Sequence, residues 1–360
     1  MSATTPLWIG TFPHAGIGTQ AGLGEGVWRV DLDPAAGALG VPRLVAETPA
    51  PTFVATHPGG RWLYAVGESD PGSVTAFAVD DDGGLTPRAT VASGGVAPCH
   101  LLVVDDTLYV ANYVDGVLGV VPLTPDGGFA PDVVASGLPA QTFDHAGTGP
   151  DPDRQEGPHA HFVALTPDRR HVLVVDLGTD ELRRYARAAD GWLTPDGVAA
   201  TLPAGTGPRH VAFAADGGRL YVAGELDAAV HVLDWHAGSA TATALQRVPA
   251  VPEAEAADGV RRSPSHLLLD GDRLLLGVRA LGLRGPDAVS VFDVLAGGAL
   301  GAPVTYPLGG PTPRHLAVVH GWTVVALQDA HALVVHDARG AQVARVGLPS
   351  PACVVPVVPA

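Results

Sequence analysis

The sequence contains no lysine, so all 21 of its basic residues are arginines. Without lysine, the chain has neither the amine that forms Schiff bases nor the lysine of a nucleotide-binding P-loop. Any anionic ligand must therefore be held by arginine, histidine or backbone N–H groups. Arginine suits this task, because its planar guanidinium can bind a carboxylate or phosphate through two hydrogen bonds.

Cysteine and long apolar runs are also scarce. Cys99 and Cys353 are the only two cysteines, too few for a disulfide framework or a four-cysteine zinc site. No apolar run approaches the length of a membrane span, and the first six residues show neither a basic nor an apolar signal region. We therefore expect a soluble, cytoplasmic protein.

Acidic residues outnumber basic ones by 37 to 21, which gives a formal net charge of -16 at pH 7. A chain of this charge repels nucleic acid and anionic membrane surfaces, so the sequence predicts neither kind of partner. Glycine (46 residues) and proline (33 residues) are spread along the whole chain, which indicates many tight turns. The sequence alone sets no oligomeric state.

One pattern of strands recurs six times. Each copy has an apolar strand, a Gly/Asp turn, a second apolar strand and a third, alternating strand, and a weaker fourth strand precedes the next copy. Copies begin about 50 residues apart, which is typical of four-stranded propeller blades. The copies are residues 53–80, 100–123, 161–185, 210–235, 266–293 and 315–337. Longer inserts near Thr124–Pro158 and Gln246–Ser265 are expected to be loops.

The two ends of the chain supply a seventh copy in two pieces. Leu7–Phe12 and Gly26–Asp33 match a second and a third strand, and Pro351–Val357 matches a first strand. Pairing the pieces would cover sheet edges that otherwise invite aggregation. The sequence thus predicts an all-β fold, a seven-bladed β-propeller of four-stranded antiparallel blades. We expect one domain over residues 1–360, closed by both termini.

Polar residues gather where the first strand of each blade begins and where the second strand ends. These points lie at the same end of an antiparallel pair, so residues from different blades converge on one mouth, the expected layout of a binding site. The unlike charges of Arg209, Glu225 and Arg279 favour a functional role there. Histidines that recur at strand starts also fit a purely structural role. This second interpretation applies to His100, His266 and His315.

Two nearby histidines are candidate metal ligands. His159 and His161 lie two residues apart, which places both imidazoles on one side of a regular strand. No spacing signature supplies a third ligand, although Glu225 or Asp176 could come from the end of a second strand, so we predict no metal and no cofactor.

Nucleophile and nucleotide motifs are missing as well. Cys99 and His100 are adjacent and would face opposite ways, so a Cys–His nucleophile pair is not expected, and Cys99 is interpreted as a small buried residue. No Gly-x-Ser-x-Gly motif or Gly-rich phosphate loop is present, which disfavours serine hydrolases and nucleotide-binding folds.

Six short stretches carry a resemblance that covers nearly the whole chain. They are Arg154–His161, Gly207–His210, Gly224–Asp227, Ala111–Tyr113, Pro98–His100 and Pro313–His315. Through them the chain resembles the lactonase family of seven-bladed propellers, which includes bacterial 6-phosphogluconolactonases and fungal carboxymuconate cyclases.

The resemblance implies a set of site residues. In the cyclases a His, a Glu and two Arg are implicated in catalysis, and by motif position these look like His161, Glu225, Arg209 and Arg279. The residues expected to bind substrate are His159, His210, Asn112, His100, Arg154, Gln155, Arg314 and His315.

Three departures from the family pattern bear on the substrate. Gly224 stands where the family usually has Asn before the Glu. Arg279 lies between Val278 and Ala280 instead of in Asn-Arg-Gly, and a longer loop follows at Leu281–Pro286. Gly67 likewise precedes Glu68.

The resemblance implies an enzyme that opens a sugar lactone such as 6-phosphogluconolactone to 6-phosphogluconate. This chemistry needs a base to activate water, cations to stabilise the oxyanion and a positive clamp for a small anionic lactone. Glu225 or His161 could be the base, and Arg209 and Arg279 the cations. Two alternatives stay open: a cycloisomerase that acts on a muconolactone at the same site, and a non-catalytic propeller that binds a protein or small ligand.

Overall fold

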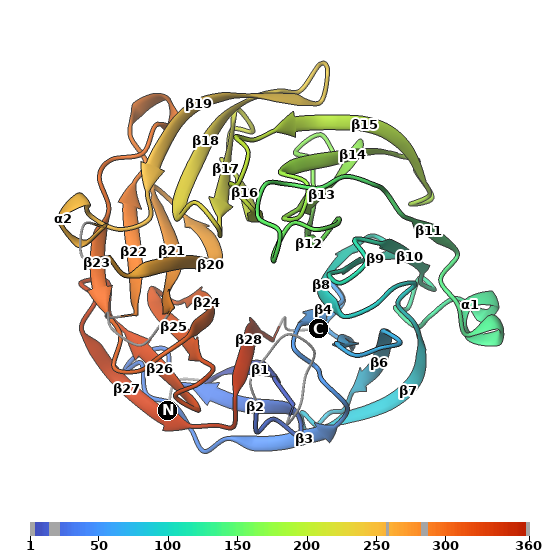
Figure 1. Cartoon of the computed structure of the whole chain (residues 1–360). Coiled ribbons are helices and arrows are strands. Elements are labelled where there is room, and N and C mark those ends of the chain that lie inside the picture. Colours follow the sequence, from blue (N-terminus) through green and yellow to red (C-terminus); the bar gives the residue numbers. More distant parts are fainter. Residues whose placement is uncertain (1–3, 14–21, 257–258, 282–286, 358–360) are drawn as a thin grey trace. The chain divides into compact units, whose positions relative to one another are not determined.

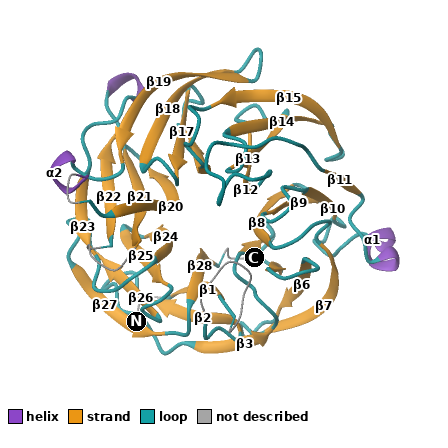
Figure 2. Ribbon diagram, in the orientation of Figure 1, coloured by secondary structure: helices purple, strands orange, loops and turns teal. Residues whose placement is uncertain are grey.

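The computed structural model describes residues 4–13, 22–256, 259–281 and 287–357. Its contacts divide the chain into two compact units, Met1–Asp144 with Arg314–Ala360, and His145–Pro313. Strands make up most of each unit (Figure 2). The expectation of one domain over residues 1–360 stays a prediction.

The first unit contains four four-stranded sheets (Figure 1). In order, one sheet is β28 (Pro351–Pro356), β1 (Thr5–Thr11), β2 (Gly26–Leu32) and β3 (Arg43–Glu47), and the next is β4 (Val54–Thr56), β5 (Trp62–Gly67), β6 (Ser73–Val79) and β7 (Leu85–Ala92). The third is β8 (Pro98–Val104), β9 (Thr107–Asn112), β10 (Leu118–Pro122) and β11 (Gln141–Phe143), with α1 (Pro131–Ser136) before β11. The fourth is β24 (Pro313–Val319), β25 (Trp322–Leu327), β26 (Ala332–His336) and β27 (Gln342–Gly347).

The second unit contains three sheets of the same kind. They are β12 (Ala160–Leu165), β13 (His171–Asp176), β14 (Glu181–Arg187) and β15 (Leu193–Thr201); then β16 (Pro208–Phe213), β17 (Arg219–Gly224), β18 (Ala229–His236) and β19 (Thr241–Pro249); then β20 (Arg261–Asp270), β21 (Arg273–Leu281), β22 (Ala288–Asp293) and β23 (Val304–Pro307). A short helix α2 (Glu253–Ala256) and a 3-10 turn (Ala296–Gly298) lie between strands. Seven four-stranded antiparallel sheets confirm the predicted number of blades.

The split sheet is formed as the sequence predicts. Strand β28, in red in Figure 1, lies beside β1, in blue, and the two pair antiparallel with Leu7 opposite Pro356 and Ile9 opposite Val354. On its other side β1 pairs with β2, where Ile9 lies opposite Trp28. The two ends of the chain therefore complete one sheet.

The second strand of each blade explains the near-continuous apolar runs of the sequence. All six residues of β9 are buried, and in β17 only Arg219 is partly exposed. A strand covered on both faces reads as an uninterrupted apolar run, because neither face meets water. The tight turn before β17 contains Gly217 at a φ of 71°, a conformation that glycine adopts without steric cost.

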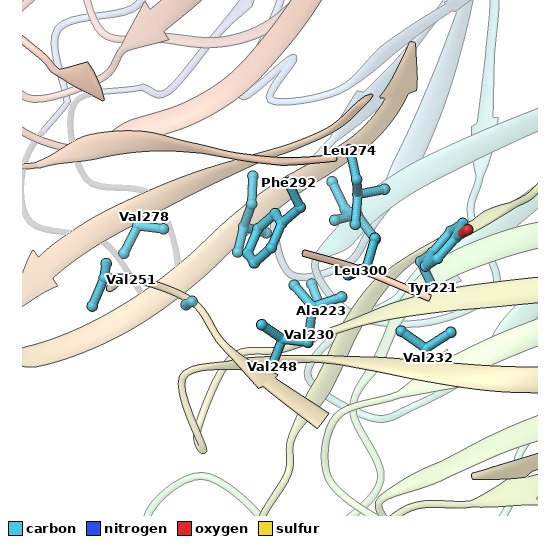
Figure 3. Packing of buried hydrophobic residues seen from close by; sticks show 13 residues of the cluster. Tyr221, Ala223, Val230, Val232, Val248, Val251, Leu274, Val278, Phe292 and Leu300 are labelled. Carbon is cyan, nitrogen blue, oxygen red and sulfur yellow. The ribbon is translucent and has the colours of Figure 1, made fainter. Parts of the chain in front are cut away.

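Apolar side chains of facing sheets form the core. In the second unit, Tyr221 and Val230 of one sheet pack with Leu274 and Phe292 of the next (Figure 3). Burying a large apolar side chain of this kind contributes about 1.5–3 kcal/mol. Such packing holds the first and second strands, whose ends carry the polar residues of interest.

The two inserts are not wholly loops, so that expectation is wrong in part. Residues Thr124–Pro158 include α1 and β11, and Gln246–Ser265 include the end of β19, α2 and the start of β20. Strand β11 has three residues, and none of them is fully buried. A strand this short and this exposed shows no alternation of apolar and polar residues in the sequence. The expected loop at Leu281–Pro286 lies outside the described residues after Leu281. No described helix is long and apolar enough to cross a membrane.

Candidate active site

Irregular pairing at the start of the first strands positions the candidate site residues. In β12 the register shifts between Ala160 and Phe162, and in β16 it shifts between Pro208 and His210. Each shift is a β-bulge, which adds one residue to one strand and re-aims the side chains beside it. The added residues are His161 and Arg209. The two therefore occupy equivalent positions in neighbouring blades.

Glu225 is the centre of a cluster of charges in the second unit. It follows the last residue of β17 and is buried, with a 4% exposed side chain. Its Oε2 atom accepts from Arg209 Nη1 at 3.0 Å and lies 3.1 Å from Arg279 Nη2. Its Oε1 atom accepts from Arg154 Nη2 at 2.8 Å. One buried carboxylate is thus shared by three guanidinium groups.

Backbone carbonyls fix two of these guanidinium groups. Arg209 Nε donates to the Ser265 carbonyl at 3.0 Å. Arg279 donates to the Ser263 carbonyl at 3.2 Å, the Ser263 hydroxyl at 2.9 Å and the Pro264 carbonyl at 3.1 Å. Cations held by several fixed acceptors are preorganised, which is what stabilisation of a developing negative charge requires.

His161 completes the cluster. Its Nε2 atom is hydrogen-bonded to Arg209 Nη1, and its ring is buried. A guanidinium has only donors, so the histidine nitrogen is the acceptor and the ring is a neutral imidazole with its proton on Nδ1. A neutral imidazole is the form that a general base needs.

The charges around Glu225 determine its protonation. Burial alone would raise the pKa of this carboxyl, but the positive charges of Arg279, Arg209 and Arg154 outweigh burial and hold the pKa well below its ordinary value of 4.5. Glu225 is therefore an ionised anchor for arginines across the neutral range, and a weak base.

Arg154 and Gln155 lie on the loop before β12 and differ in their surroundings. The Arg154 side chain is 31% exposed and reaches Glu225. Gln155 is fully buried, and its amide donates to the Leu177 carbonyl and to Asp180 Oδ1, both at 2.9 Å. These bonds engage the Gln155 amide in holding the loop, whereas Arg154 belongs to the charge cluster.

His159 precedes the bulge at His161. The bulge in β12 breaks the strict alternation that would place it on the same side as His161. Its Nε2 lies 3.2 Å from Glu156 Oε1, and its backbone N–H donates to Asp176 Oδ1 at 2.8 Å. Among the described residues, no group of three or more His, Cys, Asp or Glu is placed to hold a metal ion. The absence of a metal stays a prediction.

The recurring histidines take part in ladders of tilted and edge-to-face aromatic rings. In the second unit, His210 lies between Phe162, at a centroid distance of 4.5 Å, and His266, at 5.1 Å. Phe162, not His161, therefore occupies the repeated ring position of its blade. His210 also lies 5.5 Å from the His161 ring, so it borders the charge cluster.

The first unit has a similar ladder. Phe53 lies between His100, at 4.4 Å, and His315, at 5.9 Å. Burial and then His315 lower the pKa of His100 to about 3. His315 Nδ1 accepts from the Val354 N–H at 3.4 Å. This ladder favours the structural interpretation of the two histidines over substrate binding.

The remaining candidates also lie in the first unit. Asn112 is fully buried, accepts from the Ser93 hydroxyl at 2.6 Å and donates to the Val117 carbonyl at 3.0 Å. The Arg314 guanidinium lies 4.6 Å from the centre of the Phe12 ring, a cation–π contact. Cys99 is only half-buried, so the expectation of a buried residue is wrong. It is the added residue of a third bulge, in β8.

Sequence reasoning missed the two serines that hold the arginines. Ser265 directly precedes His266, as Arg209 precedes His210, so it occupies the position that carries a charged group in the neighbouring blade. Ser263 lies two residues earlier on the same strand. That place in the repeat was the available signal. It was obscured because β20 begins at Arg261, earlier than the repeat suggests.

The structure also explains one departure from the family pattern. A Cβ atom at Gly224 would lie 2.1 Å from Asp227 Oδ1 and 3.0 Å from Thr206 Cγ2. Asp227 cannot easily move away, because its Oδ2 accepts from His231 at 2.9 Å and from Arg247 at 3.0 Å. Glycine is therefore required at residue 224 by the local packing next to Glu225.

The chain as a whole matches proteins of known family. Residues 6–355 match the model of the family described as lactonase, 7-bladed beta-propeller. The 6-phosphogluconolactonase of Bacillus subtilis is 33% identical over 291 residues, which is 80% of this chain and 77% of that protein.

Two solved structures have the same fold over their whole length. The Pseudomonas aeruginosa periplasmic gluconolactonase is 26% identical, with a TM-score of 0.87 over 99% of this chain and 100% of that one. A protein from Lactobacillus plantarum is also 26% identical, with a TM-score of 0.85 over 98% of this chain and 99% of that one. The match runs through every described sheet, so the chain belongs to the lactonase family of seven-bladed β-propellers.

Proposed function

We propose that this protein hydrolyses a sugar lactone, with 6-phosphogluconolactone as substrate and 6-phosphogluconate as product. The observation that carries the proposal is the buried Glu225 carboxylate, shared by three guanidinium groups beside the buried His161 ring. The relative that is 33% identical, a 6-phosphogluconolactonase, supports the choice of substrate.

In this proposal the arginines stabilise the transition state. Attack of water on the lactone carbonyl places negative charge on the carbonyl oxygen before the ring C–O bond breaks. Arg209 and Arg279 are the cations for this charge, because backbone carbonyls of Ser263, Pro264 and Ser265 fix them in advance. The Glu225 carboxylate offsets part of the positive charge of the two arginines and holds their guanidinium groups in place.

His161 is the base in this proposal. It takes a proton from the attacking water and returns a proton to the ring oxygen that leaves. Glu225 is a poorer choice, because three arginines share its oxygens and favour its ionised form. The bond from Arg209 Nε to the Ser265 carbonyl holds this side chain, while its Nη1 donor must exchange His161 Nε2 for the substrate oxygen before His161 can act.

An assay on freshly prepared lactone, corrected for spontaneous hydrolysis, tests the proposal. Arg209→Ala should lower kcat about 100-fold or more, as loss of one oxyanion donor does elsewhere. Arg219→Ala is a matched control, since Arg219 lies on β17 and pairs with Asp234 at 2.6 Å. It should keep full turnover. Full turnover by both Arg209→Ala and Glu225→Gln would place the site elsewhere.

A cytoplasmic location is part of the proposal, because sugar phosphates are held inside the cell. One structural neighbour is named a periplasmic gluconolactonase. Cell fractionation of the producing organism separates the two compartments, and recovery of the protein in the periplasm would overturn this part.

A further inference from the structure

We propose that Arg154 binds the phosphate group of the substrate and makes the site selective for phosphorylated over unphosphorylated sugar lactones. This inference rests on the proposed lactone hydrolysis and names the residue that sets its substrate class. It starts from a difference among the three arginines that share Glu225.

The three guanidinium groups differ in depth. The side chains of Arg209 and Arg279 are 5% and 10% exposed, whereas that of Arg154 is 31% exposed. Arg209 and Arg279 stand on strands, and Arg154 stands on the loop before β12. Arg154 is therefore the cation at the solvent side of the cluster, where a substrate group can reach it.

The three also approach the carboxylate from different directions. Arg209 and Arg279 meet Oε2 of Glu225, beside His161, whereas Arg154 meets Oε1. Chemistry at the His161 side leaves the Arg154 side for a part of the substrate that does not react. In a phosphorylated sugar lactone, the phosphate is at the far end from the carbonyl.

The charge of the cluster suits a phosphate. Three arginines and one glutamate carry a net charge of +2, while a phosphate monoester carries roughly -1.5 to -2 near pH 7. Glu156 is a further carboxylate near Arg154, but its side chain is 59% exposed, so water screens it. An unphosphorylated lactone brings no charge to match this excess.

The named relatives differ in the same respect. One is a 6-phosphogluconolactonase and the other a gluconolactonase, so their names differ by a phosphate. In a chain without lysine, a phosphate must be held by arginine, histidine or backbone N–H groups. Arg154 is the guanidinium of the cluster best exposed for that purpose.

Kinetics on paired substrates test the inference. We would measure kcat and KM for 6-phosphogluconolactone and gluconolactone in wild type, Arg154→Ala and Arg154→Lys. Arg154→Ala should raise KM for the phosphorylated lactone roughly 10- to 100-fold, as expected for a lost charged hydrogen bond. Gluconolactone kinetics should change little, and Arg154→Lys should restore part of the preference.

Arg183→Ala is the matched control. Arg183 also contacts the loop, donating to the Ala146 carbonyl at 3.1 Å, and it pairs with Glu181, not with Glu225. The substrate preference should be unchanged in this variant. Equal loss on both lactones in Arg154→Ala, or no loss on either, would overturn the inference.

A binding measurement separates this inference from the proposed function. Calorimetry with 6-phosphogluconate and gluconate needs no turnover, and the two acids differ only in the phosphate. Wild type should prefer 6-phosphogluconate, and Arg154→Ala should lose that preference. If wild type opens neither lactone, the proposed function fails. The binding preference still tests whether Arg154 binds the phosphate group. Equal binding of both acids by wild type would refute it.

Discussion

Under the proposed function, Glu225 is both a structural and a functional residue. A buried carboxylate is costly by itself, and here three guanidinium groups offset that cost. Removing the carboxylate leaves the arginines crowded together without their counter-charge. The same residue therefore links the stability of the second unit to the chemistry of the site.

The first residue-scale prediction concerns Glu225→Gln. Because the folded pKa of Glu225 is depressed below 4.5, its contribution is complete above the ordinary pKa and is lost as pH falls through the folded pKa. At pH 7 the free energy of unfolding of the variant should be about 3 kcal/mol lower than that of wild type. Urea denaturation from pH 8 to pH 3 measures this. The difference from wild type should be constant above about pH 5 and shrink below it; a constant difference at all pH values would contradict the prediction.

The second residue-scale prediction concerns His100→Phe. The folded pKa of His100 is about 3, against an ordinary 6.5, so the unfolded chain takes up a proton that the folded chain does not. Stability should fall as pH drops from 6.5 towards 3, by up to about 1.4 kcal/mol per pH unit. Phenylalanine keeps a ring against Phe53 and cannot be protonated, so the variant should lose less stability between pH 7 and pH 4. Equal slopes in denaturation curves would refute this.

Among elements, the bulged first strands decide where the site residues lie. The sequence shows that polar residues lie at the start of each blade. It also predicts that His161, Arg209, Glu225 and Arg279 lie close together. It does not show the bulges, because an added residue changes the register without changing the residue types. In the repeat seen in the sequence, His161 therefore takes the place of His100. The pairing of the first and second strands instead gives His161 the position of Cys99.

The outer strands were also hard to predict. Strand β3 has no buried residue, and β11 has only three residues. An outer strand packs few side chains, so neither alternation nor an apolar run marks it. The second strands, buried on both faces, are the elements that the sequence identifies best.

The element-scale prediction concerns Gly224→Ala at the end of β17. The added methyl would meet Asp227 Oδ1 and Thr206, which overpacks the turn and should cost about 1–3 kcal/mol of unfolding free energy. The double variant with Asp227→Ala should cost less than the sum of the two single changes, since the clash is gone. Chemical denaturation of all four proteins measures the coupling. Full stability of Gly224→Ala would show that the turn has room.

For the molecule as a whole, the repeat was the decisive signal. Six copies and two complementary fragments predicted seven four-stranded sheets, and the structure contains them. A blade repeat is visible in a sequence because every copy must bury the same faces. The substrate is less visible, since it depends on a few side chains such as Arg154 whose position is set by a loop.

The prediction at this scale concerns the split sheet. A chain that ends at Ser350 lacks β28 and leaves one edge of β1 unpaired. It also removes Val354 and Cys353 from two buried apolar clusters. We expect this chain to be found mainly in aggregates, because an exposed edge pairs with other chains. A chain ending at Val357 keeps β28 and is the control. Soluble, cooperatively folding protein from the shorter chain, measured by size-exclusion chromatography and thermal unfolding, would contradict this.

The split sheet also limits when folding can finish during synthesis. Strand β1 leaves the ribosome among the first described residues, and its partner β28 leaves among the last. Throughout translation, the edge of β1 that will meet β28 has unpaired N–H and C=O groups, while β2 can cover the other edge early. Nascent chains on one polysome thus carry identical open edges side by side. Efficient production of this protein should depend on chaperones that shield that edge.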